Sequence, residues 1–290
     1  MKNLASGALQ KMLVSVGKPA RYRLPVGDQQ LDISDLIGHE VSIKWNGKIH
    51  CVHCQKLTNK SFNQGYCYSC FSKLAQCDQC MVNPVTCHYD AGTCREPEWG
   101  KRICFDDHIV YLANSSGVKV GITRMKNMPS RWFDQGAVQA LPIFRTASRY
   151  LAGVVEDTLR ASIADKTNWR AMLKETAAAV DLKQVRDQLV EQFADELEAI
   201  RQQHGELSIT LLGAEQVREL IYPVEVFPTK VVSQSLDKTP EISGRLMGIK
   251  GQYLMFDSGV FNVRKFTSYE VTVAAHPNDE SAKVCQDLFS

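Results

Sequence analysis

The chain has 290 residues, of which 44% are hydrophobic and 23% are charged, and its formal net charge at pH 7 is +2. This composition is typical of a folded globular protein with about two domains, and it excludes a largely disordered chain. Because the net charge is so small, it also excludes a general attraction to polyanions, so a nucleic-acid surface must be a local patch.

No segment approaches the roughly 20 consecutive apolar residues of a membrane-spanning helix. The N-terminal residues do not resemble a signal peptide, because Gln10 and Lys11 interrupt their apolar run. We therefore expect a cytoplasmic protein without a membrane partner. In that reducing compartment, closely spaced cysteine pairs indicate metal sites rather than disulfides.

The N-terminal region, residues 1–50, contains two short β-like runs at 21–26 and 41–45. The second run is followed by Asn46-Gly47, a strong signal for a two-residue hairpin turn. We expect the chain to turn there and to return as a strand over residues 48–52.

Nine of the ten cysteines lie in residues 51–104, and the tenth, Cys285, is expected to be an incidental thiol. The run Cys51-x2-Cys54-x12-Cys67-x2-Cys70 offers two Cys-x2-Cys turns, which together supply the four tetrahedral ligands that zinc prefers. A short helix is expected directly after it, over residues 71–75. We predict a structural zinc site, since so small a segment cannot build a core of its own.

A second group of cysteines follows, and it predicts a second structural zinc ion. Its expected ligands are Cys77, Cys80, Cys87 and Cys94. His88 and Cys104 compete for the fourth position. An iron–sulfur cluster is the rival interpretation, because four cysteines also bind such clusters.

Residues 105–174 predict a small α/β domain. Strands are expected at 109–113, 118–123 and 141–147, and apolar residues at helical spacing predict an amphipathic helix over 151–163. A helical segment over 175–222 follows, and Gly205 is a candidate break in it. Four short β-like runs between residues 244 and 273 then predict a C-terminal antiparallel β domain over 223–290. The sequence leaves open whether these strands complete a sheet with the N-terminal strands.

Residues 109 to 160 carry an ordered set of polar side chains on these predicted elements. Ile109-Val110-Tyr111 and Lys119-Val120-Gly121 fall on adjacent strands, Arg131 follows them, and Glu156 lies on the amphipathic helix. This set resembles the GIY-YIG nuclease superfamily, and especially its shorter phage-type branches, in which the second motif reads Lys-Ile-Gly.

The resemblance implies an endonuclease that uses Mg2+ or Mn2+. Tyr111 stands at the tyrosine of the first motif, Arg131 at the active-site arginine, and Glu156 at the carboxylate that holds the cation. Lys119 replaces the tyrosine of the second motif and is counted with them as a candidate catalytic residue. These residue types suit phosphodiester cleavage, which needs a cation on a carboxylate, a group that orients water and an arginine on the phosphate.

The local charge agrees with a nucleic-acid partner. Residues 117–149 carry six basic side chains against one acid, Asp134. The candidate nucleic-acid contacts are Arg124, Lys126, Arg145 and Arg149.

Three of the candidate catalytic residues also have a structural interpretation. Tyr111 is a common type of strand residue, Arg131 suits a local salt bridge, and Glu156 suits an ion pair with Arg160 one helical turn later.

The whole chain also resembles an uncharacterised bacterial family of zinc-binding proteins, on signatures such as Gly65-Tyr-Cys-Tyr-Ser-Cys70 and Gly248-Ile-Lys-Gly-Gln-Tyr253. We therefore predict an α+β protein: a cysteine-rich zinc module, a GIY-YIG-like small sheet with helices, a helical segment and a C-terminal antiparallel β region. The predicted function is metal-dependent cleavage of nucleic acid. The alternatives are a non-catalytic nucleic-acid-binding protein and a protein-interaction zinc protein.

Overall fold

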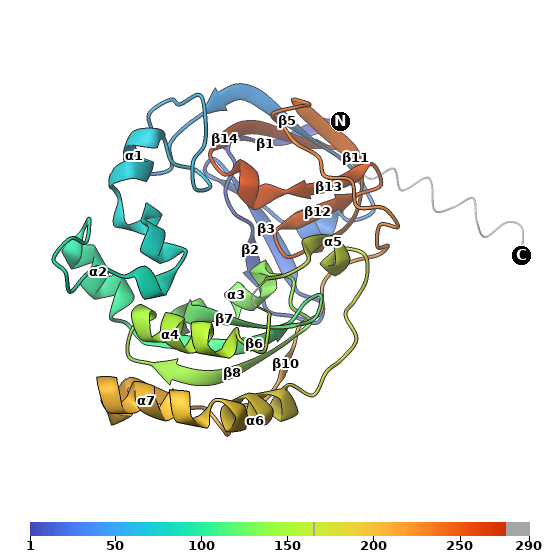
Figure 1. The fold of residues 1–290 in the computed structure, drawn as a ribbon. Coiled ribbons are helices and arrows are strands. Elements are labelled where there is room, and N and C mark those ends of the chain that lie inside the picture. Colours follow the sequence, from blue (N-terminus) through green and yellow to red (C-terminus); the bar gives the residue numbers. More distant parts are fainter. Residues whose placement is uncertain (165, 277–290) are drawn as a thin grey trace, which may run out of the picture.

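The structure, a computed structural model, describes residues 1–164 and 166–276, so Cys285 lies outside the described residues. Within these ranges the strands form three sheets, and the paired strands within each sheet are antiparallel. The expected α+β class is confirmed (Figure 1).

The large sheet is built from both ends of the chain. In spatial order its strands are β1 (Lys2–Ala8), β14 (Tyr269–Ala275), β5 (Glu40–Ile49), β11 (Glu241–Lys250), β12 (Tyr253–Phe256) and β13 (Gly259–Asn262). The strands expected near the C-terminus are present. They form one sheet with the N-terminal strands, a pairing that the sequence had left open.

The hairpin expected at Asn46-Gly47 is wrong, because β5 runs through these residues without turning back. Both halves of β5 pair with β14: Trp45 lies opposite Val271 and Ile49 opposite Tyr269, with a shift of register between them. Gly47, at φ +82°, accommodates the extra residues as a bulge. The continuous partner strand therefore overrides the local turn signal.

A small sheet of β2 (Leu13–Ser15), β3 (Arg21–Val26) and β4 (Gln29–Leu31) packs beside the large one. Tyr22 and Leu24 of β3 are fully buried and share a core with Val41, Ile43 and other residues of the large sheet. The alternation of apolar and polar residues along β3 thus buries one of its faces.

The cysteine-rich module, residues 51–104, connects the large sheet to the middle of the chain. It contains α1 (Tyr68–Lys73), α2 (Pro97–Cys104) and three single turns of 3-10 helix, η2 (Ala75–Cys77), η3 (Gln79–Met81) and η4 (Pro84–Thr86). The helix expected over residues 71–75 is therefore present but starts three residues earlier, directly after Cys67.

The middle sheet contains the strands expected over residues 109–147. Its order is β10 (Arg218–Glu219), β8 (Gln139–Thr146), β6 (His108–Asn114) and β7 (Val118–Arg124), and β9 (Ile209–Leu211) also pairs with β8. One face contributes Ile109, Tyr111 and Ala113 to the core of the large sheet, together with residues of α3 (Ser130–Asp134). The other face packs against α4 (Arg149–Leu159), the expected amphipathic helix.

The helical segment is shorter than expected. It contains α6 (Leu182–Gln192) and α7 (Ala194–His204), and the short helix α5 (Trp169–Met172) precedes it. Gly205, with φ +97°, ends α7 as expected. The prediction of helix over 206–220 is wrong, because β9 and β10 lie there and complete the middle sheet through β8. In the described part of the chain, no helix is both long enough and apolar enough to cross a membrane.

Candidate functional site

Four cysteine side chains meet between the end of β5 and the start of α1. They are Cys51, Cys54, Cys67 and Cys70. The backbone N–H of Val52 donates to the carbonyl of Gly65 at 2.8 Å and so joins the two Cys-x2-Cys turns. A Cβ atom at Gly65 would lie only 2.6 Å from Cγ1 of Val52, so this close approach requires glycine.

The spacing of these sulfur atoms fits a single metal ion. All four lie within 4.8 Å of one another, and Sγ of Cys54 lies 3.8 Å from Sγ of Cys67. Four thiolates about 2.3 Å from one zinc ion in a tetrahedron are about 3.8 Å apart, whereas disulfide sulfurs are about 2.05 Å apart. Thiolates on separate irons of a cluster lie further apart than thiolates on one ion. These cysteines could therefore hold one ion such as zinc.

The thiols of this cluster differ in acidity. Burial raises the pKa of Cys51, but hydrogen bonds from the backbone of Cys54, Cys67 and His53 outweigh it and lower this pKa to about 6. Burial and thiol hydrogen bonds raise the pKa of Cys70 to about 12. A cation that binds here would therefore displace the proton of Cys70.

Of the other five cysteines of the module, one lies near the first cluster and four lie together elsewhere. Cys77 bonds with Asn63 and lies near Cys51 of the first cluster. The remaining four line one small cavity and are Cys80, Cys87, Cys94 and Cys104. Asp78 and His88 also reach this cavity, and their ligand atoms lie within 4.8 Å of the sulfur of Cys80.

Three side chains expected to act together meet where β6, α3 and α4 converge. The hydroxyl of Tyr111 donates to Oε1 of Gln135 at 3.1 Å, and the Arg131 guanidinium donates to the same hydroxyl. Glu156 lies close enough for its charge to act on Tyr111. Tyr111 is fully buried, and burial raises its pKa despite the nearby arginine, so its phenol stays protonated at neutral pH.

Gly121 provides the space for this tyrosine. It lies directly opposite Tyr111 in the pairing of β6 with β7, and a Cβ atom on it would lie 2.8 Å from the tyrosine hydroxyl oxygen. Lys119 lies two residues earlier on β7, opposite Ala113, and is 6% exposed. The glycine of the second motif therefore has a packing role in this structure.

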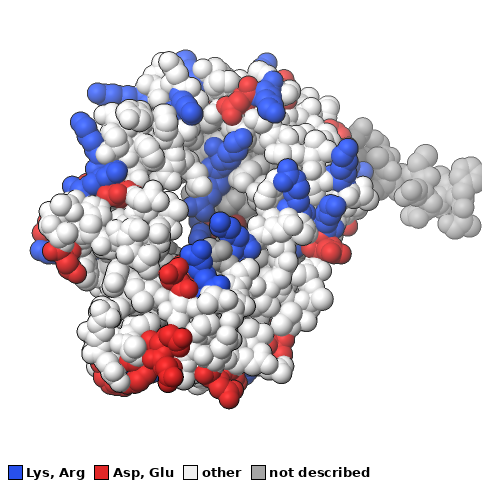
Figure 2. Space-filling model, in the orientation of Figure 1, with Lys and Arg blue, Asp and Glu red and all other residues white. Residues whose placement is uncertain are grey.

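Three arginines lie near one another around this cluster. Burial lowers the pKa of Arg149 and of Arg264, and the positive charge of Arg131 lowers both further. Arg149 also lies near Glu156 and donates to the carbonyl of Met81 at 2.7 Å. Figure 2 shows Lys and Arg side chains gathered around a hollow at the centre of the molecule. Cations held this close together favour an anionic ligand.

A cavity of about 850 Å3 lies between the cysteine-rich module and the large sheet. Lys60, Arg264 and Lys265 are its basic lining residues. Asp134 of α3 also lines it, and the carboxylate of Asp134 accepts hydrogen bonds from Lys11 and, at 2.9 Å, from Gln252. These contacts join the middle of the chain to both of its ends.

The other predicted nucleic-acid contacts lie in different surroundings. Lys126 pairs with Asp106 at 3.0 Å, and Arg145 pairs with Asp107 at 3.6 Å. Arg124 lies near His108. The two ion pairs are exposed, so they neutralise part of the local positive charge while leaving both basic side chains open to solvent.

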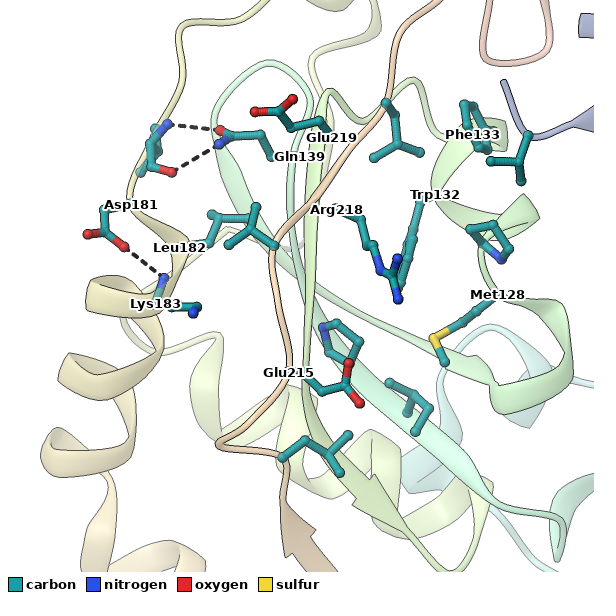
Figure 3. Close-up of a pocket in the computed structure, with 18 of the residues that line it drawn as sticks. Met128, Trp132, Phe133, Gln139, Asp181, Leu182, Lys183, Glu215, Arg218 and Glu219 are labelled. Carbon is teal, nitrogen blue, oxygen red and sulfur yellow. Dashed lines mark hydrogen bonds between the residues drawn. The ribbon is translucent and has the colours of Figure 1, made fainter. Parts of the chain in front are cut away.

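Another cavity, of about 950 Å3, is lined by none of the predicted site residues (Figure 3). Asp181, Leu182 and Lys183 lie on one side of it, and Met128 and Trp132 lie on the other. It opens beside β10, away from Tyr111 and the cysteines.

Sequence reasoning missed Arg264 and Gln252. Arg264 lies 133 positions after Arg131 in the chain, yet the two charges influence each other. Arg264 belongs to no quoted motif, and Gln252 lies in the signature Gly248–Tyr253, to which no role was assigned. Only the pairing of the chain ends brings both residues to the site.

Comparison with known proteins identifies the family. Residues 38–271 match the family described as "Protein of unknown function (DUF2797)", and since this range covers most of the chain, the chain belongs to that family. The expected membership of a family of unknown function is thereby confirmed. No curated protein and no solved structure shows significant similarity.

Proposed function

We propose that this protein binds the phosphate backbone of nucleic acid in its central hollow and cleaves it with the help of a divalent cation, either Mg2+ or Mn2+. The observation that carries the proposal is the contact of Tyr111 with Arg131, beside Glu156. These residues were chosen from a resemblance to the GIY-YIG nucleases, and they come from two helices and a strand. Their convergence supports the proposal, because the resemblance requires these three side chains to act at one site.

The residues fit distinct roles. Arg131 has Arg149 and Arg264 nearby, so a phosphate there would relieve the repulsion between their charges. Tyr111 is fully buried, so we assign it to positioning: its hydroxyl, held by Gln135, fixes the Arg131 guanidinium. Lys119, also buried, has no role in binding the substrate in this proposal.

Glu156 would hold the divalent cation. A partly buried carboxylate is the kind of oxygen ligand that Mg2+ accepts, and Mg2+ commonly binds one or two carboxylates together with substrate phosphates. When bound, such a cation would polarise the phosphate and lower the pKa of a bound water. Glu156 also lies near Arg149, which links the proposed cation site to the arginines that would bind phosphate.

The cavity that Asp134 lines would hold the nucleotides next to the cleaved phosphate. Its lining combines basic residues with side chains that can bond base edges or stack on bases, and these include Asn59, Asn63, Gln64, Asn262 and Tyr253. Such a mixture suits an unpaired strand better than a duplex, because only unpaired bases can reach amide groups and aromatic rings.

The test is cleavage of labelled single-stranded and double-stranded DNA and RNA with Mg2+ or Mn2+. We expect Glu156→Gln and Arg131→Ala to lower the rate at least 100-fold. The matched controls are Glu98→Gln and Arg201→Ala, which alter an exposed carboxylate on α2 and a surface arginine on α7. Both controls should keep the wild-type rate.

Binding without cleavage of any substrate would refute the catalytic part and leave a nucleic-acid-binding protein. The electrostatic cluster of Arg131 with Arg149 and Arg264 favours this second function independently of the cation. In that case affinity should fall with rising salt and should weaken in Arg264→Ala. Absence of salt-dependent binding would refute both.

A further inference from the structure

We propose that Cys80, Cys87, Cys94 and Cys104 bind a second zinc ion, separate from the ion held by the first cluster. This inference goes beyond the proposed cleavage and does not depend on it, because it concerns the metal content of the protein.

The four thiols come from separate segments and face one space. Cys80 lies on η3, Cys87 follows η4, Cys94 precedes α2, and Cys104 is the last residue of α2. All four line a cavity of about 20 Å3 whose other walls include Met81, Tyr89 and Trp99. A volume of that size is about that of a single small occupant.

Nothing else in the described structure uses these sulfurs. None of them takes part in a disulfide or a hydrogen bond among the described residues, although all are at least partly buried. Cys80 lies within electrostatic reach of the other three, and Cys104 lies within reach of Cys87 and Cys94. Four thiols that line one small space are the ligand types of a structural zinc site. Their sulfurs do not all lie within 4.8 Å of one another, so binding of an ion would draw them together.

Asp78 and His88 form the competing ligand set with Cys80, but both already have partners. The carboxylate of Asp78 accepts from the backbone N–H of Gln79 at 2.6 Å and pairs with Nε of Arg95 at 2.9 Å. His88 bonds through Nδ1 to Thr93 at 2.8 Å and through Nε2 to Asp78 at 3.3 Å. This network suits residues that orient the ligand segments rather than bind the ion.

Cys77 is left out of the set, although Cys77-x2-Cys80 has the spacing of a ligand pair. The side chain of Cys77 bonds with Asn63 and lies near Cys51 and Arg95. The two cysteines of the pair therefore face different neighbours, and Cys104, ten positions after Cys94, completes the four thiols.

The second ion would also hold the module against α4. Pro84 of η4 packs so closely on Gly153 of α4 that a Cβ there would lie 2.5 Å from the proline ring. Arg149, at the start of the same helix, bonds to Met81 and lies near Cys80 and Cys104. The metal would thus support the helix that carries Arg149 and Glu156.

The test is the zinc content per chain, measured by elemental analysis and native mass spectrometry on purified full-length protein. We expect two zinc ions in the wild type and in the control variant Cys77→Ser, and one in Cys104→Ser and in Cys94→Ser. His88→Ala should keep both ions. X-ray absorption at the zinc edge of the wild type checks the ligands without any substitution. Four sulfurs and no nitrogen per zinc are expected.

The inference is overturned if the wild type contains only one zinc ion per chain, or if Cys104→Ser still contains two. It is also overturned if Cys77→Ser or His88→Ala loses one of the two ions. Nitrogen or oxygen ligands in the absorption spectrum also contradict it. Iron with inorganic sulfide in place of zinc refutes the single-ion centre. If Cys104→Ser does not fold, the spectrum of the wild type decides.

Discussion

Replacement of Gly121 by alanine should destabilise the protein far more than a change of one methyl group on its surface. The added Cβ would lie 2.8 Å from the hydroxyl oxygen of Tyr111 and 2.9 Å from its Cζ atom. Tyr111 has no exposed surface and packs edge-on against Trp132, with ring centroids 6.1 Å apart, so its ring has little room to retreat.

The magnitude follows from two contributions. Inserting a methyl group into a well-packed interior costs about 1 to 3 kcal/mol. Displacing the Tyr111 hydroxyl from Gln135 removes a hydrogen bond worth about 1 kcal/mol. We therefore expect the free energy of unfolding to fall by about 2 to 4 kcal/mol.

The assay is urea unfolding, with Gly213→Ala as the matched control, because a Cβ at Gly213 meets nothing within 4 Å. In a Tyr111→Phe background the cost of Gly121→Ala should shrink but persist, since the ring carbon remains in contact range. Equal unfolding midpoints for Gly121→Ala and Gly213→Ala would refute this account of why glycine is needed opposite Tyr111.

Two buried ionisable groups should make the free energy of unfolding depend on pH, one in the acidic range and the other in the alkaline range. Burial lowers the pKa of His108 to about 4. In the unfolded chain the histidine takes up a proton near pH 6.5, whereas the folded state does so only near pH 4. As the pH falls from 6.5 to 4, the free energy of unfolding of the wild type should therefore fall by about 3 kcal/mol relative to that of His108→Asn. The same pH dependence for both proteins in urea unfolding would contradict this. Burial lowers the pKa of Lys250 to about 8. As the pH rises, the folded state loses this proton before the unfolded chain does. Between pH 8 and 10 the free energy of unfolding of the wild type should therefore rise by about 2 to 3 kcal/mol relative to that of Lys250→Met. A difference between the two proteins that does not change with pH would disprove this.

Local sequence patterns predicted the elements whose determinants are close together in the chain. Three strands of the middle sheet, β6, β7 and β8, and helix α4 were predicted from local patterns, because the determinants of each lie within a few residues. The first cysteine cluster, which could hold a metal ion, was predicted from two Cys-x2-Cys turns, since each turn brings its two sulfurs together within a few residues.

Patterns that depend on a distant partner were misleading. Asn46-Gly47 has hairpin chemistry, but a partner strand more than 200 residues away keeps β5 extended. Residues after Gly205 were expected to be helical, but they form strands that pair with the edge of β8 not used by β6. In both cases the hydrogen bonds of a sheet outweigh local propensity.

The sequence by itself determined the class of the protein, its cysteine-rich module and the residue types of its candidate site. Only the tertiary structure decided that Cys104 rather than Cys77 faces Cys80, and that Arg264 joins Arg131 and Arg149. The reason is physical: a turn fixes which neighbours along the chain meet. Contacts between remote residues depend on how the two ends of the chain pair in one sheet and pack against the module between them.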